Sequence, residues 1–322
     1  MQQRYGMTIP FDGLPLHAQR EAIVELGDRG YTDVWSSEAD GADAFTPLAL
    51  ASTWAPTLRL GSAIVPAYTR GPATLAQSVA ALADAAPGRV AFGIGTSSNV
   101  IVERWNDIPF EEPYKKTRDM VRFLRTALTG EKVKEAYDTF EVKGFKLGRV
   151  PEEQPKIMIA ALREGMLRLA GREGDGAIIN WLSAEDVAQV APIVHEQGEG
   201  KEVIARIFVA PTTDAATVRA MGRYAIAAYL NVPVYAAFHE WVGRGDVLAP
   251  MWKAWKDGDR KAALEAIPDE VVDQLIVHGS PEECREHVQR YVDNGVTCPA
   301  LAVLPFGLDP VQAARDLAPD HG

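Results

Sequence analysis

The chain has 322 residues, of which 47% are hydrophobic and 24% are charged, and its formal net charge is −11. This composition is typical of a globular protein with one large domain or two modest ones, and the negative charge argues against nucleic acid or an anionic membrane as the main partner. No apolar stretch approaches the ~20 residues of a membrane span.

The first segment, MQQRYGMTIPF, lacks the basic and apolar regions that mark a signal peptide. Cys284 and Cys298 are the only cysteines. Two thiols without a close spacing suit a reducing compartment. We therefore expect the protein to act in the cytoplasm on a small molecule.

Short apolar runs recur along the chain and alternate with helical patterns. The runs cover residues 5–9, 32–37, 58–65, 89–95, 156–161, 176–182, 203–210 and 299–304. They are apolar nearly throughout, which is typical of parallel strands covered on both faces. Eight strands alternating with helices predict an α/β fold, a (β/α)₈ TIM barrel. A doubly wound Rossmann sheet shares the same alternation and is the alternative.

We expect one domain over residues 1–322, with insertions at about 97–110, 131–151 and 231–276. The segment KVKEAYDTFEVKGFKLGRV (132–150) alternates like a β-hairpin. Residues 231–276 have a helical pattern with Met251, Trp252 and Trp255 at helical spacing, which usually indicates a core or a subunit contact. We also expect a homo-oligomer, to which this region would contribute.

The stretch GRVAFGIGTSSN (88–99) decides between the two folds. The dinucleotide fingerprint requires a third glycine three positions after Gly95, where the chain has Ser98, and an acidic strand end ~20 residues on. Neither is present, so we interpret the run as a barrel strand. Its glycines would let a flat ligand approach the backbone, or would only ease strand packing; Thr96 and Ser97 would supply hydroxyls at the strand's carboxyl end.

Several segments together resemble the luciferase-like monooxygenase superfamily and, within it, the coenzyme F420-dependent oxidoreductases. They are YTDVWSSE, LRLGSAIVPAYTRGPATLAQ, GRVAFGIGT, PKIMIAALREGMLRLAGREGDGAIINWL and HGSPEECREHVQRYVDNGV. They follow the family's order from about residue 5 to residue 305. The resemblance implies a TIM-like barrel and a deazaflavin coenzyme, with FMN as the alternative.

The resemblance also implies a coenzyme site. Relatives often have a non-prolyl cis peptide that supports the coenzyme ring, and the matching bond is Ala63–Ile64. An ordinary trans strand is the alternative, in which any cis bond would be Val65–Pro66. Ser37 belongs to the same expected site.

In relatives the coenzyme phosphate lies on the loop after the fifth strand. The matching residues are Leu162, Arg163, Glu164, Gly165 and Met166, where amides at a helix N-terminus suit a phosphodiester. Relatives often have small residues or proline in place of Arg163 and Glu164. Asn180 would bond the coenzyme or substrate, and Trp181 would form a pocket wall or a buried structural contact.

For proton transfer, relatives commonly have an acidic residue followed by histidine after the second strand. This chain has Glu38 followed by Ala39. Glu38 is our catalytic candidate, and a loop salt bridge is its structural alternative. His239, in FHEWV, is the second candidate, and a packed residue is its alternative. No metal site is expected, because HExxH would need histidine where Gly243 stands.

Three functions follow as hypotheses. The first is hydride transfer between C5 of F420 and a small, apolar organic molecule. The second is an FMN-dependent monooxygenase that uses reduced flavin and oxygen. The third is a homologue that binds the coenzyme without turnover, because Ala39 replaces a histidine that is catalytic in some relatives.

Overall fold

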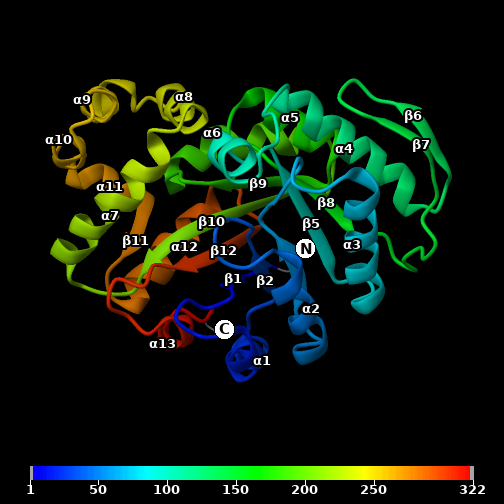
Figure 1. Ribbon diagram of the computed structural model, residues 1–322. Coiled ribbons are helices and arrows are strands. Elements are labelled where there is room, and N and C mark those ends of the chain that lie inside the picture. The colour runs from blue at the N-terminus through cyan, green and yellow to red at the C-terminus, as the bar shows by residue number, and fades with distance from the viewer. Residues whose placement is uncertain (1–2, 320–322) are drawn as a thin grey trace.

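The computed structural model describes residues 3–319, and its centre is a closed parallel barrel (Figure 1). Its eight strands are β1 (Gly6–Ile9), β2 (Asp33–Ser36), β3 (Arg59–Ser62), β5 (Val90–Gly95), β8 (Lys156–Ala160), β9 (Gly176–Asn180), β10 (Glu202–Ala210) and β12 (Cys298–Val303). Strand β10 pairs with both β9 and β12, which closes the sheet. The TIM-barrel prediction is confirmed, and the alternative of an open Rossmann sheet is wrong.

Helices surround the barrel. They are α1 (Arg20–Asp28), α2 (Phe45–Trp54), α3 (Pro72–Ala85), α4 (Pro113–Leu128), α5 (Glu164–Glu173), α6 (Ala184–His195), α7 (Ala215–Leu230), α12 (Pro281–Asp293) and α13 (Pro310–Asp316). Apolar side chains between these helices and the strands form the main core. Over residues 3–319, the helices are too short or too polar to cross a membrane.

The expected hairpin and helical insertion are both present. Strands β6 (Val133–Ala136) and β7 (Glu141–Phe145) pair antiparallel, and in Figure 1 they lie beside α4 at one edge of the molecule. The helical insertion lies at the opposite edge. Its elements are α8 (Pro233–Trp241), α9 (Gly245–Lys256), α10 (Arg260–Glu265), α11 (Asp269–Leu275) and the short strand β11 (Ile276–His278). The segment after β5 contains a short π-helix (Val100–Trp105).

One tryptophan fills the barrel interior. Trp35 is 1% exposed and belongs to an inner cluster with small and aliphatic side chains of other strands. Gly61 and Gly6 make room for its ring, because a Cβ on Gly61 would lie 2.2 Å from Trp35 Cε3 and one on Gly6 would lie 2.7 Å from Trp35 Cδ1. The centre of the barrel is therefore closed by protein, and a ligand must bind at one of its ends.

This packing predicts the effect of one added methyl group. Gly61→Ala should lower the free energy of unfolding by about 1–3 kcal/mol, because overpacking forces Trp35 off its position. Urea denaturation measures the change. Gly41→Ala is the matched control, because a Cβ there meets nothing within 4 Å. Equal stability of the two variants would contradict this account of the barrel interior.

Charged side chains close the amino end of the barrel. Arg59, Asp33 and Glu202 are the first residues of their strands and are 6%, 0% and 4% exposed. The Arg59 guanidinium binds Asp33 through Nε and Glu202 through Nη1, the latter at 2.7 Å. Burial disfavours its charge, but the two carboxylates outweigh burial and raise the pKa of Arg59. Lys156 also pairs with Glu202. This network is structural and leaves the carboxyl end for function.

Candidate active site

Most of the predicted site residues lie at the carboxyl end of the barrel. They are Ser37 and Glu38 after β2, Ala63 and Ile64 after β3, Thr96 and Ser97 after β5, Leu162 to Met166 after β8, and Asn180 and Trp181 at the end of β9. In a closed parallel barrel these strand ends share one rim, where TIM-barrel active sites are found. His239, on α8, is the exception.

The expected unusual peptide bond is present. Ala63–Ile64 is a non-prolyl cis bond, as predicted, and Val65–Pro66 is not among the cis bonds of residues 3–319. Both residues are half-buried. The carbonyl of Ile64 accepts a hydrogen bond from the amide of Glu38 at 3.2 Å, which ties the ends of β2 and β3 together.

The Glu38 carboxylate is held by its neighbours. Arg70 Nη1 lies 2.6 Å from Glu38 Oε1, and the Thr69 hydroxyl donates to the same oxygen at 3.3 Å. Glu38 Oε2 accepts from the Ala44 amide at 3.2 Å. The Arg70 guanidinium lies over the Phe45 ring, 5.2 Å from its centroid. The salt bridge considered as an alternative therefore exists, and it fixes the carboxylate at the rim. The sequence reasoning missed Arg70.

The loop after β8 ends in an open helix N-terminus. Arg163 is the N-cap of α5 in an extended conformation, and no side chain caps the helix. Glu164 is exposed and pairs with Arg168 one turn later, at 2.8 Å. A Cβ on Gly165 would meet nothing within 4 Å. The amino end of α5 is thus uncapped by side chains and has room at Gly165, as an anion site requires.

Between these segments, the glycines of β5 serve packing. A Cβ on Gly93 would lie 2.0 Å from the Ser62 carbonyl oxygen, and one on Gly95 would lie 2.7 Å from Ala160 Cβ. The strand-packing alternative is therefore the correct one, since protein atoms fill the space before both glycines. Ser97 has a φ of 61°, a value that non-glycine residues seldom adopt, and turns the chain away from the strand end.

Aromatic rings gather on the β9–β10 side. Trp181 is 1% exposed and has a φ of 52°. It stacks on Phe208 at 4.0 Å and contacts Tyr229 at 5.0 Å between centroids. Burial raises the pKa of Tyr235 to about 12, so its phenol stays protonated and donates to Asn180 Oδ1 at 3.1 Å. Trp181 is thus a buried packing residue beside Asn180.

His239 is enclosed by protein. It is 0% exposed on α8, and both of its ring nitrogens are buried. Burial and, to a smaller extent, the positive charge of Arg244 lower its pKa to about 3, although a hydrogen bond with the backbone of Trp181 opposes the shift. A neutral, enclosed imidazole cannot exchange protons with a substrate, so the structure favours the packed-residue alternative over catalysis.

The buried histidine predicts a pH dependence of stability. Its pKa is near 6.5 when unfolded and lower when folded, so the unfolded chain binds the extra proton as pH falls. As the pH falls from 7.5 to 5, binding of this proton by the unfolded chain should lower the free energy of unfolding by about 2 kcal/mol. His239→Gln should remove that part of the slope in denaturant titrations, whereas His17→Gln, at an exposed position, should not. Parallel slopes for all three proteins would contradict the burial of a neutral imidazole.

Some buried polar atoms on or beside the barrel strands lack hydrogen-bond partners within residues 3–319. Thr8 Oγ1 of β1, Trp181 Nε1 and Arg206 Nε of β10 are buried without hydrogen-bond partners in the described part of the chain. The register pairs Arg206 with Asn180 at the end of β9. Burial lowers the pKa of Arg206, while Tyr229, Tyr235 and Asp12 oppose the shift. The sequence reasoning missed Arg206, although a single charged residue within the otherwise apolar run VIARIFVA could have identified it as a candidate.

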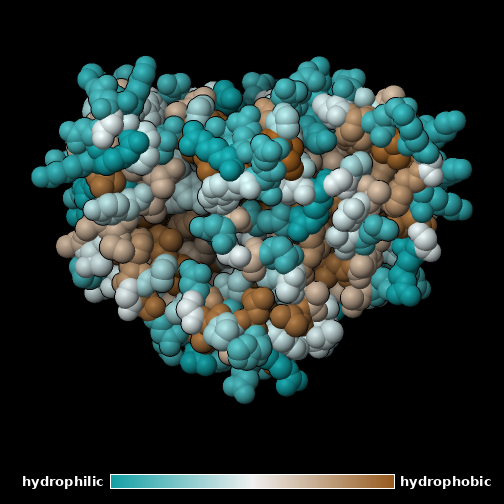
Figure 2. Space-filling view, in the orientation of Figure 1, coloured by the Kyte–Doolittle hydropathy of each residue, from teal (hydrophilic) through white to brown (hydrophobic). Residues whose placement is uncertain are grey.

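These features fit a ligand that carries a phosphate group. The helix N-terminus supplies amides for a phosphodiester, and buried donors on the rim lack acceptors. On the face shown in Figure 2, hydrophilic side chains cover much of the outer helices and apolar ones lie in the recesses between them.

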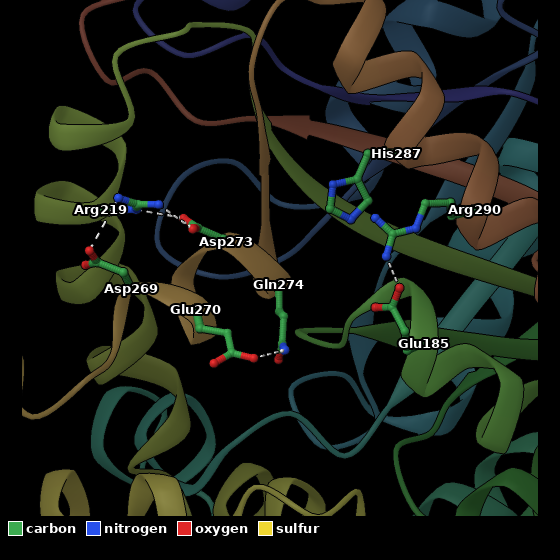
Figure 3. Close-up of a pocket in the computed structure, with 8 residues that line it drawn as sticks. All are labelled: Glu185, Arg219, Asp269, Glu270, Asp273, Gln274, His287 and Arg290. Atoms are coloured by element: carbon green, nitrogen blue, oxygen red, sulfur yellow. Dashed lines mark hydrogen bonds and ion pairs between the residues drawn. The ribbon is translucent and has the colours of Figure 1, made fainter.

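A separate cavity of about 380 Å³ lies among the outer helices α6, α7, α11 and α12 (Figure 3). Its charged side chains are largely paired with one another. Arg219 binds Asp273 at 2.6 Å, and Arg290 binds Glu185. Because these charges are already matched and the lining residues are not on the strand ends, we assign this cavity no part in the site.

Comparison with known proteins places the fold in a family. Residues 3–298 match the family model described as luciferase-like monooxygenase. The chain is 26% identical over 306 residues to 5,10-methylenetetrahydromethanopterin reductase of Archaeoglobus fulgidus, covering 90% of each chain.

Solved structures share the fold. Coenzyme F420-dependent tetrahydromethanopterin reductase of Methanopyrus kandleri superposes with a TM-score of 0.77 at 18% identity, covering 99% of this chain and 98% of that one. An F420-dependent secondary alcohol dehydrogenase gives 0.76 at 17% identity, covering 98% and 97%. A Pseudomonas putida Baeyer-Villiger monooxygenase in complex with FMN gives 0.68 at 15% identity, covering 99% and 97%.

Proposed function

Because the chain belongs to the luciferase-like monooxygenase family, we propose that it is a coenzyme F420-dependent oxidoreductase acting on a small organic substrate. The observation that carries this choice of coenzyme is the similarity, over 98% of both chains, to a putative coenzyme F420-dependent oxidoreductase of Mycobacterium tuberculosis. Such an identity of 26% supports the class of coenzyme and leaves the substrate to be argued from the site.

The rim residues have distinct roles in this proposal. The first-turn amides of α5, with Arg163, would bind the coenzyme phosphate, and Gly165 would let it approach closely. Ile64 and its cis bond would support one face of the ring. Ser37, Thr96 and Ser97 would line its edges. When bound, the deazaflavin supplies hydride transfer at C5.

Glu38 would handle the proton that accompanies the hydride. Arg70 and Thr69 occupy its Oε1, whereas Oε2 accepts only one amide, that of Ala44, among residues 3–319. We assign the proton to Oε2. The ion pair with Arg70 keeps the carboxylate in place, which a proton carrier requires, because its oxygen must lie within hydrogen-bond reach of the substrate.

Side-by-side titration of the apoprotein with F420 and with FMN tests the choice of coenzyme. The proposal expects F420 to bind at least tenfold more tightly, measured by quenching of coenzyme fluorescence. Tighter binding of FMN would overturn it and favour the oxygen-using monooxygenase. Binding of F420 without exchange of label at C5, across a broad panel of alcohols, aldehydes, enones and acids, would favour the homologue without turnover.

A further inference from the structure

Two arginines lie on the barrel strands, Arg59 buried and Arg206 half-buried, and they differ in their ion pairs. Arg59 at the amino end is bound by Asp33 and Glu202. Arg206, nearer the carboxyl end, forms no ion pair with any carboxylate of residues 3–319, and its Nε is buried without an acceptor. Asp12 acts on it electrostatically, but Asp12 is exposed and outside ion-pair distance. Withdrawing even part of an unmatched guanidinium from water destabilises a fold, so the presence of Arg206 here calls for a functional explanation.

The surroundings of Arg206 define what could bind. Its guanidinium lies over the Phe208 ring, 5.1 Å from the centroid, and Phe208 stacks on Trp181. Asn180 lies beside Arg206 in the register, and its oxygen is occupied by Tyr235, which leaves its NH₂ group as a donor. The position therefore offers the planar guanidinium of Arg206, the NH₂ group of Asn180 as a hydrogen-bond donor, and neighbouring aromatic rings. Arg206 is half-buried, so part of the fork is accessible.

We propose that Arg206 binds a carboxylate of the substrate, so that the enzyme acts on small organic acids with an apolar or aromatic body. The planar fork of arginine matches two carboxylate oxygens, and Asn180 can donate a further hydrogen bond. This inference rests on the proposed function only in assigning the anion to the substrate. It replaces the expectation of a wholly apolar substrate.

The topology separates Arg206 from the expected coenzyme positions. Around the barrel, β10 is four strands from β3 in both directions, through β9, β8 and β5 or through β12, β1 and β2. Ile64 follows β3, so Arg206 is on the opposite wall. The phosphate site at Gly165 follows β8, two strands away from β10. A substrate held by Arg206 would therefore lie across from Ile64, on the side where a supported ring stays open.

The first test compares the two arginines by thermal unfolding of the apoprotein. Arg206→Met should unfold at the same temperature as the wild type or higher, because it removes an unmatched buried charge. Arg59→Met should unfold at a clearly lower temperature. A decrease for Arg206→Met as large as that for Arg59→Met would show that Arg206 is structural, and would overturn the proposal.

The second test is calorimetric binding of benzoate and of benzamide, which has the same shape without the charge. The wild-type apoprotein should bind benzoate at least tenfold more tightly than benzamide. Arg206→Met should abolish the preference, and Arg206→Lys should retain part of it. Equal binding of the two probes to wild type, or an unchanged preference in Arg206→Met, would overturn the proposal.

A third experiment tests whether Arg206 binds the substrate or the coenzyme. The affinity of Arg206→Met for F420 should stay within about threefold of wild type. If it falls as far as benzoate binding does, Arg206 serves the coenzyme and the substrate assignment is wrong. The benzoate experiment contains no coenzyme, so its result does not depend on whether F420 or FMN binds. Failure of the proposed function would be seen in the titration with F420 and FMN instead.

Discussion

Arg59→Met should lower the free energy of unfolding by about 3–5 kcal/mol, because it leaves two buried carboxylates without their shared cation. Asp33 and Glu202 are 0% and 4% exposed, so neither can recover its hydration in the folded state. Arg4 at 3.0 Å from Asp33, and Lys156 beside Glu202, compensate in part. Denaturation in urea at neutral pH measures the loss.

Arg59→Lys is the matched control for this prediction. Lysine keeps the positive charge but has no planar fork to bind both carboxylates at once. Arg59→Lys should therefore lower the free energy of unfolding clearly less than Arg59→Met does. A loss below about 1 kcal/mol for Arg59→Met would be typical of a solvent-exposed pair, and would contradict a buried network at the amino end.

Gly165→Asp should weaken coenzyme binding about 100-fold, equivalent to about 2.7 kcal/mol. The new carboxylate would lie in the first turn of α5, where the amides and the macrodipole would otherwise bind the phosphate, and like charges at contact repel. The space beside Gly165 is open, so the folded structure can accept the side chain. Equilibrium titration with F420 measures the effect.

Gly148→Asp provides the control for charge and for loss of glycine. Gly148 is also exposed, and a Cβ there likewise meets nothing within 4 Å, but it follows the β6–β7 hairpin and not the rim. Its variant should bind F420 as wild type does. If the two aspartate variants bind the coenzyme equally well, the phosphate is not held at the amino end of α5.

Much of the fold could be predicted because buried parallel strands have a plain sequence signature. Each of the eight apolar runs forms a barrel strand. Their ends are less well predicted, because they depend on backbone geometry that composition does not show. The run 58–65 is divided at the cis bond Ala63–Ile64, and the run 176–182 ends at Asn180, because Trp181 leaves the extended conformation. The strand β11 has three residues and directly follows a helix, so it was not recognised in the sequence as a separate apolar run.

The candidate site was predicted unevenly. The rim positions follow from strand order and from the family resemblance, and the cis bond is where the resemblance placed it. The roles of the rim residues remain predictions. The sequence left His239 open between catalysis and packing, because its burial depends on contacts between α8 and distant segments, which local sequence does not report. Arg206 was missed although its run is otherwise apolar, because the absence of a matching carboxylate is visible only in three dimensions.

The central claim is that the rim of this barrel binds a deazaflavin. It is tested most directly by producing the protein in a host that makes both F420 and FMN, and identifying the bound coenzyme by native mass spectrometry and absorbance. The account predicts a complex with the mass and spectrum of F420, lost in Gly165→Asp and kept in Gly148→Asp. A complex with FMN alone would contradict it.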